Sequence, residues 1–366
     1  MKLKLLFDYE IFSKQRAGGI SNYFYNLGRE LINLNIDTIF FSPLHRNQYL
    51  SSLSKKNIIG FDVKYIPFKL NFILDAVNFF FTKKLLKKNI YNLMHQTYYS
   101  ENNFTNVKKI CTVYDLTNEK FPNFFPQSNN ITNLKKKTIL NSDHIICISD
   151  NTKKDLINFF NINPDKIATT LLASDLYCPD VTIKNKKLRN YILFVGSRSS
   201  YKNFESLLNA YSSSSFLKNN FKIALFGGER FGENDQKLMK CFNIDYNKIW
   251  IIDEKKYRLQ YIYSNVAALV YPSIYEGFGL PIVEAMSCGC PVISSLAGST
   301  KEVGGEGIDY FDPLDVSQMK NLIEKLVTSD LLQESKIAYG YKRANLFSWK
   351  KCAQETLEVY KKVIAS

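Results

Sequence analysis

The sequence predicts an α/β protein of two doubly wound domains, each a parallel sheet covered by helices. Its 366 residues exceed the usual size of one domain, so two hydrophobic cores are expected. Short apolar runs alternate with amphipathic segments of helical period, which is the pattern of parallel sheets. The alternation starts again at residues 191–196, after a polar stretch at residues 179–189 that we interpret as a linker.

The first half is expected to hold strands at residues 4–7, 38–41, 64–66, 93–95, 110–114, 144–148 and 167–171. The second half is expected to hold strands at residues 191–196, 222–226, 249–252, 267–271, 291–294 and 309–311. Amphipathic helices are predicted between them, among others at residues 21–34, 151–160, 204–211, 256–263 and 317–328. Ser149 is expected to cap the helix at residues 151–160.

We place the first domain at residues 1–180 and the second at residues 188–349. The terminal segment, residues 350–366, has a strong helical pattern and is expected to pack back on the first domain. Ligands of open parallel sheets bind at the carboxyl ends of the strands. The active site is therefore expected in a cleft between the two domains.

Cysteine usage and the apolar runs predict a cytoplasmic protein. The first apolar run, residues 2–8, is too short for a signal peptide, and no run of about 18 uncharged apolar residues could form a transmembrane helix. Cys111 and Cys147, two of seven cysteines, lie in apolar strand-like runs and are expected to be reduced core residues. Cys288 and Cys290 lack a second pair and a nearby histidine, so no zinc site is expected there.

The formal net charge of +14 predicts an anionic partner: nucleic acid, anionic lipid or a phosphorylated substrate. The excess is +8 over residues 1–180 and +6 over the remainder, so it forms no basic tail, and coding bias is an alternative origin. A nucleic-acid-binding protein would need a concentrated basic stripe or a known reading motif, and neither is found. Residues 70–91 mix aromatic residues with lysines, which suits a helix on an anionic membrane surface; a core helix with a solvated lysine face is the alternative.

The most informative motif spans residues 273–293 and is typical of a loop, a helix start and a buried strand. Its glycines permit positive φ and a close approach of the backbone to a ligand, and Pro281 suits the first turn of a helix. Free N–H groups at such a start bind an anion, most naturally a phosphate. Glu276 precedes the helix and Glu284 lies inside it, where a carboxylate can reach hydroxyls beside that phosphate. Ordinary capping by acidic residues is the alternative. The residues of the loop expected to contact the ligand are Gly277, Phe278, Gly279 and Leu280.

Arg198 and Lys202 follow the strand at residues 191–196 and lie four residues apart. A guanidinium and an ammonium at a strand's carboxyl end suit a diphosphate, and fixed cations there stabilise the charge on a departing diphosphate. Gly18 and Gly19, in the loop after the first strand, can present backbone N–H groups to the same ligand. The alternatives are solvated basic side chains and a flexible loop before a helix capped by Ser21.

Three residues at the ends of other strands are candidates for sugar contacts. Tyr114 can donate one hydrogen bond, but a phenol with a pKa near 10 cannot act as a base at neutral pH. Asp115 is expected either to orient an acceptor or to cap the following turn. For His95 we expect a structural role, with contact to the acceptor as the alternative.

These segments resemble the family 4 retaining glycosyltransferases, which have the GT-B fold of two Rossmann-like domains. The resemblance rests on Gly-Gly-Ile at residues 18–20, on Val-Gly-x-Arg-x3-Lys-Asn at residues 195–203, and on the run from Tyr-Pro-Ser to Cys-Pro-Val-Ile at residues 271–293. It departs from the family at Tyr114, where many relatives have histidine. That departure weakens a mechanism with a histidine base there, and leaves intact one in which the departing phosphate takes the acceptor's proton.

The resemblance implies a metal-independent enzyme that moves a sugar from a nucleotide donor to a glycan or lipid-linked acceptor. Arg198 and Lys202 would hold the diphosphate, Glu276 the sugar hydroxyls and Glu284 the ribose, with Tyr114 near the donor sugar. No cofactor is expected, and no Asp-x-Asp pair for a metal occurs in the sequence. Bacterial relatives often build surface polysaccharides, frequently with mannose, so a GDP donor is preferred to a UDP donor and peripheral contact with the inner membrane face is expected. A sugar-nucleotide epimerase or hydrolase of the same fold is the alternative function.

Overall fold

The computed structural model describes residues 2–63, 70–102, 104–178, 188–198 and 200–365. The chain forms two compact units. The first unit comprises Met1–Leu172 and Trp349–Ser366, and the second unit comprises Ala173–Ser348. The division falls before residue 180, because residues 173–178 run with the second unit, where the Cys178 N–H donates to the Ser287 carbonyl at 3.2 Å.

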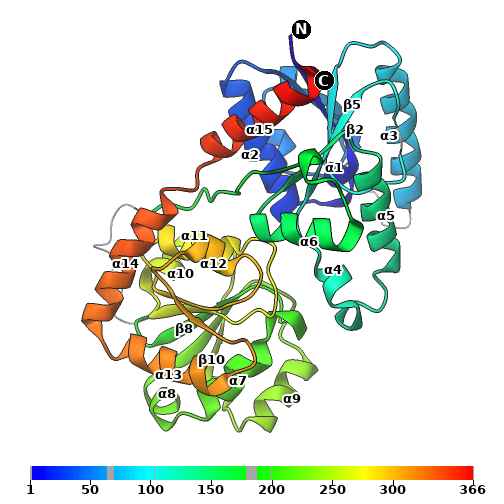
Figure 1. The fold of residues 1–366 in the computed structure, drawn as a ribbon. Helices are drawn as coiled ribbons and strands as arrows, with labels where there is room; N and C mark the ends of the chain where they lie inside the picture. The colour runs from blue at the N-terminus through cyan, green and yellow to red at the C-terminus, as the bar shows by residue number, and fades with distance from the viewer. Residues whose placement is uncertain (1, 64–69, 103, 179–187, 199, 366) are drawn as a thin grey trace. The chain divides into compact units, whose positions relative to one another are not determined.

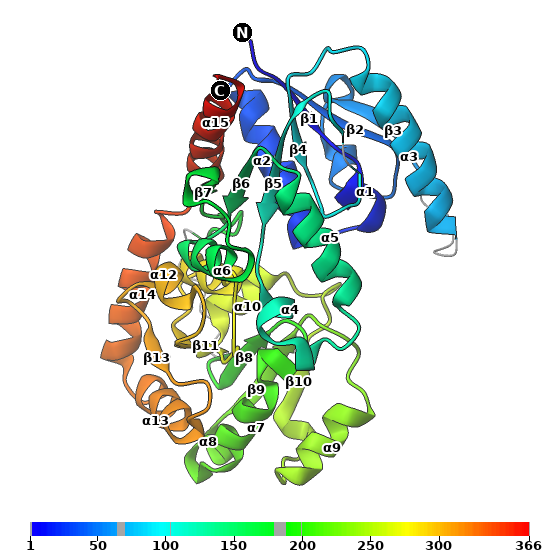
Figure 2. The ribbon, with the colours of Figure 1, turned by 45° about the vertical axis from the view of Figure 1, so that its right-hand side comes forward.

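The sheet of the first unit, at the blue-to-green end of the chain in Figure 1, has seven parallel strands in the order β3-β2-β1-β4-β5-β6-β7, all labelled in Figure 2. The strand order reverses beside β1, which pairs with β2 on one side and β4 on the other. A crevice at the carboxyl ends of the strands is the usual ligand site at such a reversal. The strands are β1 (Lys4–Phe7), β2 (Asp37–His45), β3 (Ile58–Asp62), β4 (Leu93–Gln96), β5 (Lys108–Val113), β6 (His144–Cys147) and β7 (Ile167–Thr169).

The sheet of the second unit has six parallel strands in the order β10-β9-β8-β11-β12-β13 (Figure 2). Its order reverses beside β8, which pairs with β9 and β11. The strands are β8 (Tyr191–Val195), β9 (Lys222–Phe226), β10 (Ile249–Ile251), β11 (Ala268–Tyr271), β12 (Val292–Ser295) and β13 (Asp309–Phe311). The predicted class, two parallel-sheet α/β domains, is confirmed.

Helices connect the strands in both units, as parallel sheets require. The described helices of the first unit are α1 (Glu10–Lys14), α2 (Gly19–Asn33), α3 (Asn71–Leu86), α4 (Thr117–Lys120), α5 (Asn129–Leu140), α6 (Asp150–Phe160) and α15 (Trp349–Ala365). Those of the second unit are α7 (Phe204–Ser212), α8 (Ser215–Asn220), α9 (Glu233–Cys241), α10 (Leu259–Asn265), α11 (Leu280–Ser287), α12 (Thr300–Gly304), α13 (Val316–Val327) and α14 (Asp330–Ala344). The last helix of the chain, α15, lies beside α2 in both ribbon views.

Burial follows the apolar runs of the sequence. In the second unit, one core joins the sheet to α7 and α13 through Phe194, Leu207, Ile293 and Ile323. In the first unit, buried residues of β5 and β6 pack on α5 and α6. All seven cysteines are free thiols, and Cys111 and Cys147 are buried as predicted. Among the described residues, no helix is both long and apolar enough to cross a bilayer.

Local sequence patterns predicted the ends of most of the expected strands and helices within a few residues. The edge strand β3 was not predicted: its short apolar run, Ile58-Ile-Gly-Phe, contains a glycine, and its side chains are exposed or half-buried. The strand expected at residues 64–66 and most of the expected linker lie outside the described residues. Ser21 is not a cap: α2 starts at Gly19, and the buried Ser21 hydroxyl donates to the Gly18 carbonyl at 3.1 Å. The predicted cap of α6 is confirmed, since Ser149 Oγ accepts from the Thr152 N–H at 3.0 Å.

Candidate active site

The start of α11 has the backbone that the motif predicts. Gly279 is the N-cap, with φ of +94°, and Pro281 lies in the first turn. Because glycine brings no side-chain cap, the Leu280 N–H of this turn has no side-chain acceptor among the described residues and suits an external anion. Pro281 has no N–H, and the Ile282 N–H donates to the Gly279 carbonyl at 2.9 Å. Gly277, unlike Gly279, does not have positive φ. The Phe278 ring is buried edge-on against Phe347 at 5.8 Å between centroids, so it packs in the core and only its backbone is suited to a ligand.

Lys202 and Glu276 form a largely buried ion pair near the carboxyl end of β11. Lys202 Nζ lies 2.6 Å from Glu276 Oε1, and the side chains are 15% and 11% exposed. The same Nζ lies 3.4 Å from the hydroxyl of Tyr271, the last residue of β11. Burial disfavours the charged lysine, but the interactions with Tyr271 and Glu276 outweigh it and raise the pKa of Lys202. The lysine is therefore a fixed cation.

The backbone of Glu276 is held by the loop between β12 and α12. Its carbonyl accepts hydrogen bonds from the N–H and the hydroxyl of Ser299, both at 3.1 Å. Gly298 has φ of +59°, and a Cβ built there would lie 2.2 Å from the Glu276 carbonyl oxygen. Only glycine satisfies both conditions. Our sequence reasoning did not select Gly298 or Ser299, although a glycine soon after a predicted strand was a usable signal.

Arg198 forms an ion pair with a different carboxylate. Its Nε lies 2.9 Å from Asp235 Oδ1 in the first turn of α9, and its guanidinium also donates to the Glu229 carbonyl and stacks over the Phe231 ring. The Arg198 side chain is 6% exposed. Sequence reasoning predicted the arginine but missed Asp235, because the two are 37 residues apart.

Two glycine loops meet beside Arg198. Gly227 and Gly228, directly after β9, have φ of +79° and +83°. A Cβ at Gly228 would lie 2.7 Å from the carbonyl oxygen of Gly196, which follows β8 and has φ of +114°. Glycine is required here so that the two loops can pack together at the reversal of the strand order. The dipeptide Gly227-Gly228 was a second signal that sequence reasoning left unused.

Glu284 lies one turn into α11, half-buried, and its Oε2 accepts a hydrogen bond from the Tyr263 hydroxyl at 3.1 Å. Burial raises the pKa of Glu284 to about 7, and the hydrogen bond from Tyr263 opposes that shift only in part. The second unit thus contains four of the predicted groups, Arg198, Lys202, Glu276 and Glu284, together with the start of α11.

Gly18, Gly19, Tyr114, Asp115 and His95 belong to the first unit. Gly18 is extended, with φ of 170°, and is the N-cap of α2. A Cβ at Gly19 would meet no heavy atom within 4 Å, so the backbone there is open to approach. The contact of Gly18 and Gly19 with a diphosphate remains a prediction.

Tyr114 and Asp115 follow β5. The Tyr114 hydroxyl is buried and has no hydrogen-bond partner among the described residues. Asp115 Oδ1 accepts from the Thr117 N–H at 3.0 Å, which is the turn-capping role foreseen as an alternative. The Asp115 carbonyl accepts from Lys135 Nζ at 2.9 Å, and Lys135 in turn pairs with Glu119 at 2.8 Å in a site almost closed to solvent.

His95 lies in the core and its side chain is not accessible to solvent. Its Nδ1 is 2.6 Å from the Tyr360 hydroxyl and its Nε2 is 2.8 Å from Thr112 Oγ1, with the ring fully buried. Burial lowers the pKa of His95 to about 3, so the ring stays neutral. This is the structural role that the sequence favoured, and the acceptor contact considered for His95 is inconsistent with its burial.

Two family models together cover most of the chain. The model described as Glycosyltransferase Family 4 matches residues 17–170, and the model described as Glycosyl transferases group 1 matches residues 181–343. O-antigen chain mannosyltransferase B of Escherichia coli is 31% identical over 272 residues, covering 69% of this chain and 70% of that protein. The chain belongs to the family 4 glycosyltransferases. O-antigen chain mannosyltransferase RfbU of Salmonella typhimurium is 28% identical over 219 residues, covering 59% of this chain and 60% of that protein.

Solved structures assign the fold of this glycosyltransferase as GT-B. Sucrose-phosphate synthase from Thermosynechococcus elongatus superposes with a TM-score of 0.78 at 20% identity and covers 100% of both chains. WaaG, a glycosyltransferase involved in lipopolysaccharide biosynthesis, gives 0.71 at 13% identity, covering 97% of this chain and 99% of its own. Anabaena Alr3699/HepE in complex with UDP and glucose gives 0.72 at 16% identity, covering 98% and 99%.

Proposed function

We propose that this glycosyltransferase transfers a hexose from a nucleotide donor, with retention of anomeric configuration and without a metal, to a glycan or lipid-linked acceptor of a surface polysaccharide. GDP-mannose is the first candidate donor and a UDP-linked sugar the second. The observation that carries the proposal is the buried Lys202–Glu276 pair beside the uncapped start of α11. The relatives described as O-antigen mannosyltransferases support mannose, and the complex described as holding UDP and glucose supports a nucleotide sugar.

The residues of the second unit suit the parts of such a donor. The Leu280 N–H at the start of α11, Lys202 and Arg198 suit the diphosphate, since all three offer positive charge or a donor. Glu284, supported by the Tyr263 hydroxyl, suits the ribose diol, and Glu276 suits the hydroxyls of the transferred sugar. Because Arg198 is bonded to Asp235 and to the Glu229 carbonyl, it reaches the phosphate either through its remaining N–H groups or by leaving Asp235.

In the reaction we propose, the acceptor hydroxyl attacks the anomeric carbon from the face on which the diphosphate leaves. The bond between the anomeric carbon and the phosphate oxygen breaks, the new glycosidic bond forms, and the acceptor proton passes to the departing phosphate oxygen. Tyr114 is unsuited to taking that proton, because burial raises the pKa of its phenol well above its usual value. The two fixed cations stabilise the negative charge that builds on the leaving group.

The test uses the purified full-length protein with GDP-mannose, UDP-glucose and UDP-N-acetylglucosamine, and methyl α-D-mannopyranoside as probe acceptor. NMR of the product is expected to show an α-linked mannoside at an unchanged rate in the presence of EDTA. A β-linked product would contradict retention, and loss of the reaction in EDTA would contradict metal independence. An epimerised or hydrolysed nucleotide sugar without any transfer product would favour the alternative function. The matched controls are Lys202→Ala, expected to lower the rate by about 10²–10³, and the exposed Lys301→Ala, expected to be fully active.

We further propose that the outer face of α3 rests on an anionic membrane surface. The inner face of this helix is buried through Leu74, Asn78, Thr82 and Leu86, which recur every four residues. The opposite side exposes large apolar side chains and lysines, so the helix is both a core helix and an amphipathic surface helix. The exposed residues are Phe72, Ile73, Phe80, Phe81, Lys83 and Lys84 on α3, Lys87 and Lys88 directly after it, and Ile59 and Phe61 of the edge strand β3.

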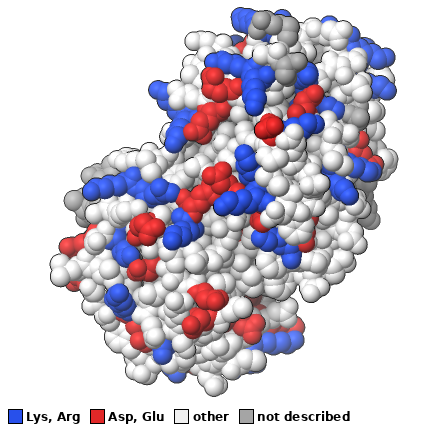
Figure 3. Space-filling model, viewed as in Figure 1, with Lys and Arg blue, Asp and Glu red and all other residues white. Residues whose placement is uncertain are grey.

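The charge pattern supports a local membrane contact over a general affinity for polyanions. Figure 3 shows basic and acidic side chains interspersed over the face in view, without a continuous basic stripe. Co-sedimentation with phosphatidylglycerol vesicles, compared with phosphatidylcholine vesicles, tests the proposal. Phe72→Ser combined with Phe80→Ser is expected to release the protein from the anionic vesicles, whereas Leu331→Ser, at a leucine of the second unit that is more exposed than either phenylalanine, is not. Equal binding to both kinds of vesicle would contradict it.

A further inference from the structure

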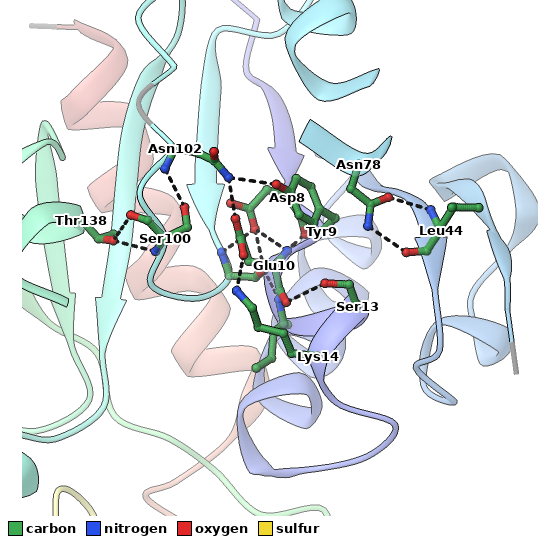
Figure 4. Close-up of polar contacts among 12 residues, drawn as sticks. Asp8, Tyr9, Glu10, Ser13, Lys14, Leu44, Asn78, Ser100, Asn102 and Thr138 are labelled. Carbon is green, nitrogen blue, oxygen red and sulfur yellow. Dashed lines mark hydrogen bonds and ion pairs between the residues drawn. The ribbon is translucent and has the colours of Figure 1, made fainter. Parts of the chain in front are cut away.

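The first unit contains a polar cavity that the reaction described above does not use. Its volume is about 330 Å³, which is within the range of small-ligand sites of about 300–1,000 Å³. It lies beyond the carboxyl end of β1, between α1, the start of α3 and the loop after β4 (Figure 4). The lining residues that matter here are Glu10, Lys14, Asp75, Phe79, Tyr99 and Asn102.

The polar groups of this cavity are fixed by hydrogen bonds. Glu10 Oε1 accepts from Asn102 Nδ2 at 2.9 Å, and Glu10 Oε2 pairs with Lys14 Nζ. Asn102 Nδ2 also lies 2.9 Å from the Tyr9 hydroxyl. The Glu10 side chain is 4% exposed, and Figure 4 shows these groups converging between α1 and the loop after β4. Such preorganisation is typical of a binding site, because little freedom is lost when a ligand arrives.

A second layer of contacts supports these groups. Asp8, fully buried beneath Glu10, accepts from the Thr97 N–H at 2.8 Å and from the Glu10 N–H at 3.3 Å. The loop that carries Asn102 is attached to α5, where Ser100 and Thr138 exchange two hydrogen bonds of 3.0 and 3.1 Å. The position of the Asn102 amide is therefore determined by two elements of the unit.

The chemistry of the cavity favours a neutral polyhydroxyl ligand. Asp75 has no hydrogen-bond or ion-pair partner among the described residues and is half-buried, so its carboxylate can accept from hydroxyls. Three carboxylates line the cavity, Glu10, Asp75 and Glu101, against one lysine, Lys14, and Glu101 pairs with Lys137 outside the lining. The lining is therefore negative and disfavours phosphates and sugar acids. No group of three or more metal-ligating side chains occurs in the described part of the chain, so a cation site is not supported. Phe79, half-buried in the lining, supplies an apolar surface for a sugar ring, whereas Tyr99 is 4% exposed and has Lys135 over its ring.

We propose that this cavity binds a neutral pyranose unit of the acceptor glycan, with Glu10, Asp75 and Asn102 bonding its hydroxyl groups. The assignment rests on the proposed function, because it takes the ligand to be part of the acceptor. The proposed acceptor contacts are therefore Glu10, Asp75 and Asn102, which line a cavity, and not His95, which is buried. The sugar unit need not carry the reacting hydroxyl; a unit further along the glycan would serve to position the chain.

Ligand-observed NMR on the full-length protein tests the proposal with three probes: methyl α-D-mannopyranoside, methyl α-D-glucopyranoside and methyl α-D-glucuronide. A neutral glycoside is expected to bind in the millimolar range, and the glucuronide to bind at least tenfold more weakly. Asn102→Ala and Asp75→Asn are each expected to weaken binding of the neutral glycoside about tenfold. The matched control is Glu358→Gln, an exposed carboxylate of the same unit that should change nothing. Unchanged melting temperatures would show that the variants fold.

The outcomes separate this inference from the proposed function. If the protein transfers sugar, and Asn102→Ala and Asp75→Asn leave both glycoside binding and the acceptor KM unchanged, the inference is overturned and the function stands. If no donor is turned over, yet a neutral glycoside binds and both variants weaken it, the site stands and the proposed function fails. Equal binding of the glucuronide, or no binding of any neutral glycoside, overturns the inference. In the Arg198→Ala, Lys202→Ala double variant, glycoside binding is expected to persist while transfer is lost.

Discussion

The carboxyl edges of the two sheets offer a ligand different chemical groups. Around β8 and β11 of the second unit, five glycines have positive φ, and two cations are held by carboxylates. Around β1 and β4 of the first unit, polar side chains line the edge instead, and among the described residues of that unit the glycine with positive φ is Gly60, within β3. The glycines are Gly196, Gly227, Gly228, Gly279 and Gly298.

The difference follows from the ligand that each edge suits. A phosphate is compact and anionic, so backbone N–H groups and fixed cations recognise it, and bare glycines allow the close approach. A sugar presents hydroxyls in several directions, which planar carboxylate and amide side chains match better. The predictions below test this contrast in order of expected effect.

Removing a cation from the second unit should have the largest effect. Lys202→Ala is expected to cost about 3–4 kcal/mol of transition-state stabilisation, a fall in kcat of about 10²–10³, because it removes a fixed charge beside the leaving group. Steady-state kinetics with the accepted nucleotide sugar measures it. Lys301→Ala, at a lysine that is 60% exposed, should retain full activity. Wild-type rates in Lys202→Ala would show that the edge of β11 does not hold the diphosphate.

Stability should depend on pH through Glu284. Its pKa of about 7, raised by burial from the usual 4.5, means that the folded protein keeps a proton which the unfolded chain releases. The resulting stabilisation is complete below pH 4.5 and is lost as the pH rises through 7, by at most about 3 kcal/mol. Chemical unfolding of wild type and Glu284→Gln from pH 4 to 8 measures it. The difference between the two proteins should fall with pH up to about 7; a difference that rises would refute the burial of this carboxyl.

Replacement of a glycine by alanine is expected to affect the stability of the fold differently in the two units. Gly298→Ala is expected to destabilise the fold by about 1–3 kcal/mol, since its Cβ meets the Glu276 carbonyl and its φ is positive. Gly19→Ala should leave the free energy of unfolding unchanged or raise it slightly, because its Cβ meets open space at the first position of α2. Thermal unfolding of both variants is the measurement. Equal losses would mean that the glycine in the first unit is also required by packing.

The smallest effect concerns a helix start away from the proposed sites. Ser149→Ala removes the hydroxyl that caps α6 and should cost about 1 kcal/mol of stability with activity unchanged. By contrast, the N-caps of α2 and α11 are glycines, Gly18 and Gly279, which bring no side-chain acceptor of their own, although the Ser21 N–H of α2 donates to Gln15 Oε1 at 3.4 Å. Urea unfolding combined with a transfer assay tests the prediction. A large loss of activity in Ser149→Ala would show that the contrast between capped and open helix starts is not functional.

The sequence by itself determined the α/β class, most of the strands and the start of α11, because these depend on local patterns of apolar residues, glycine and proline. It also indicated Arg198, Lys202, Glu276 and Glu284 as candidates through their spacing. It did not indicate β3, whose short apolar run is interrupted by Gly60, or the burial of His95.

Only the tertiary structure decided which polar groups meet. Arg198 pairs with Asp235 across 37 residues, Lys202 with Glu276 across 74, and Glu10 with Asn102 across 92. Such pairs form where the strand order brings distant loops to one edge of a sheet, and burial then sets their protonation. A local sequence pattern determines neither the strand order nor the burial of a side chain. Both depend on the tertiary structure.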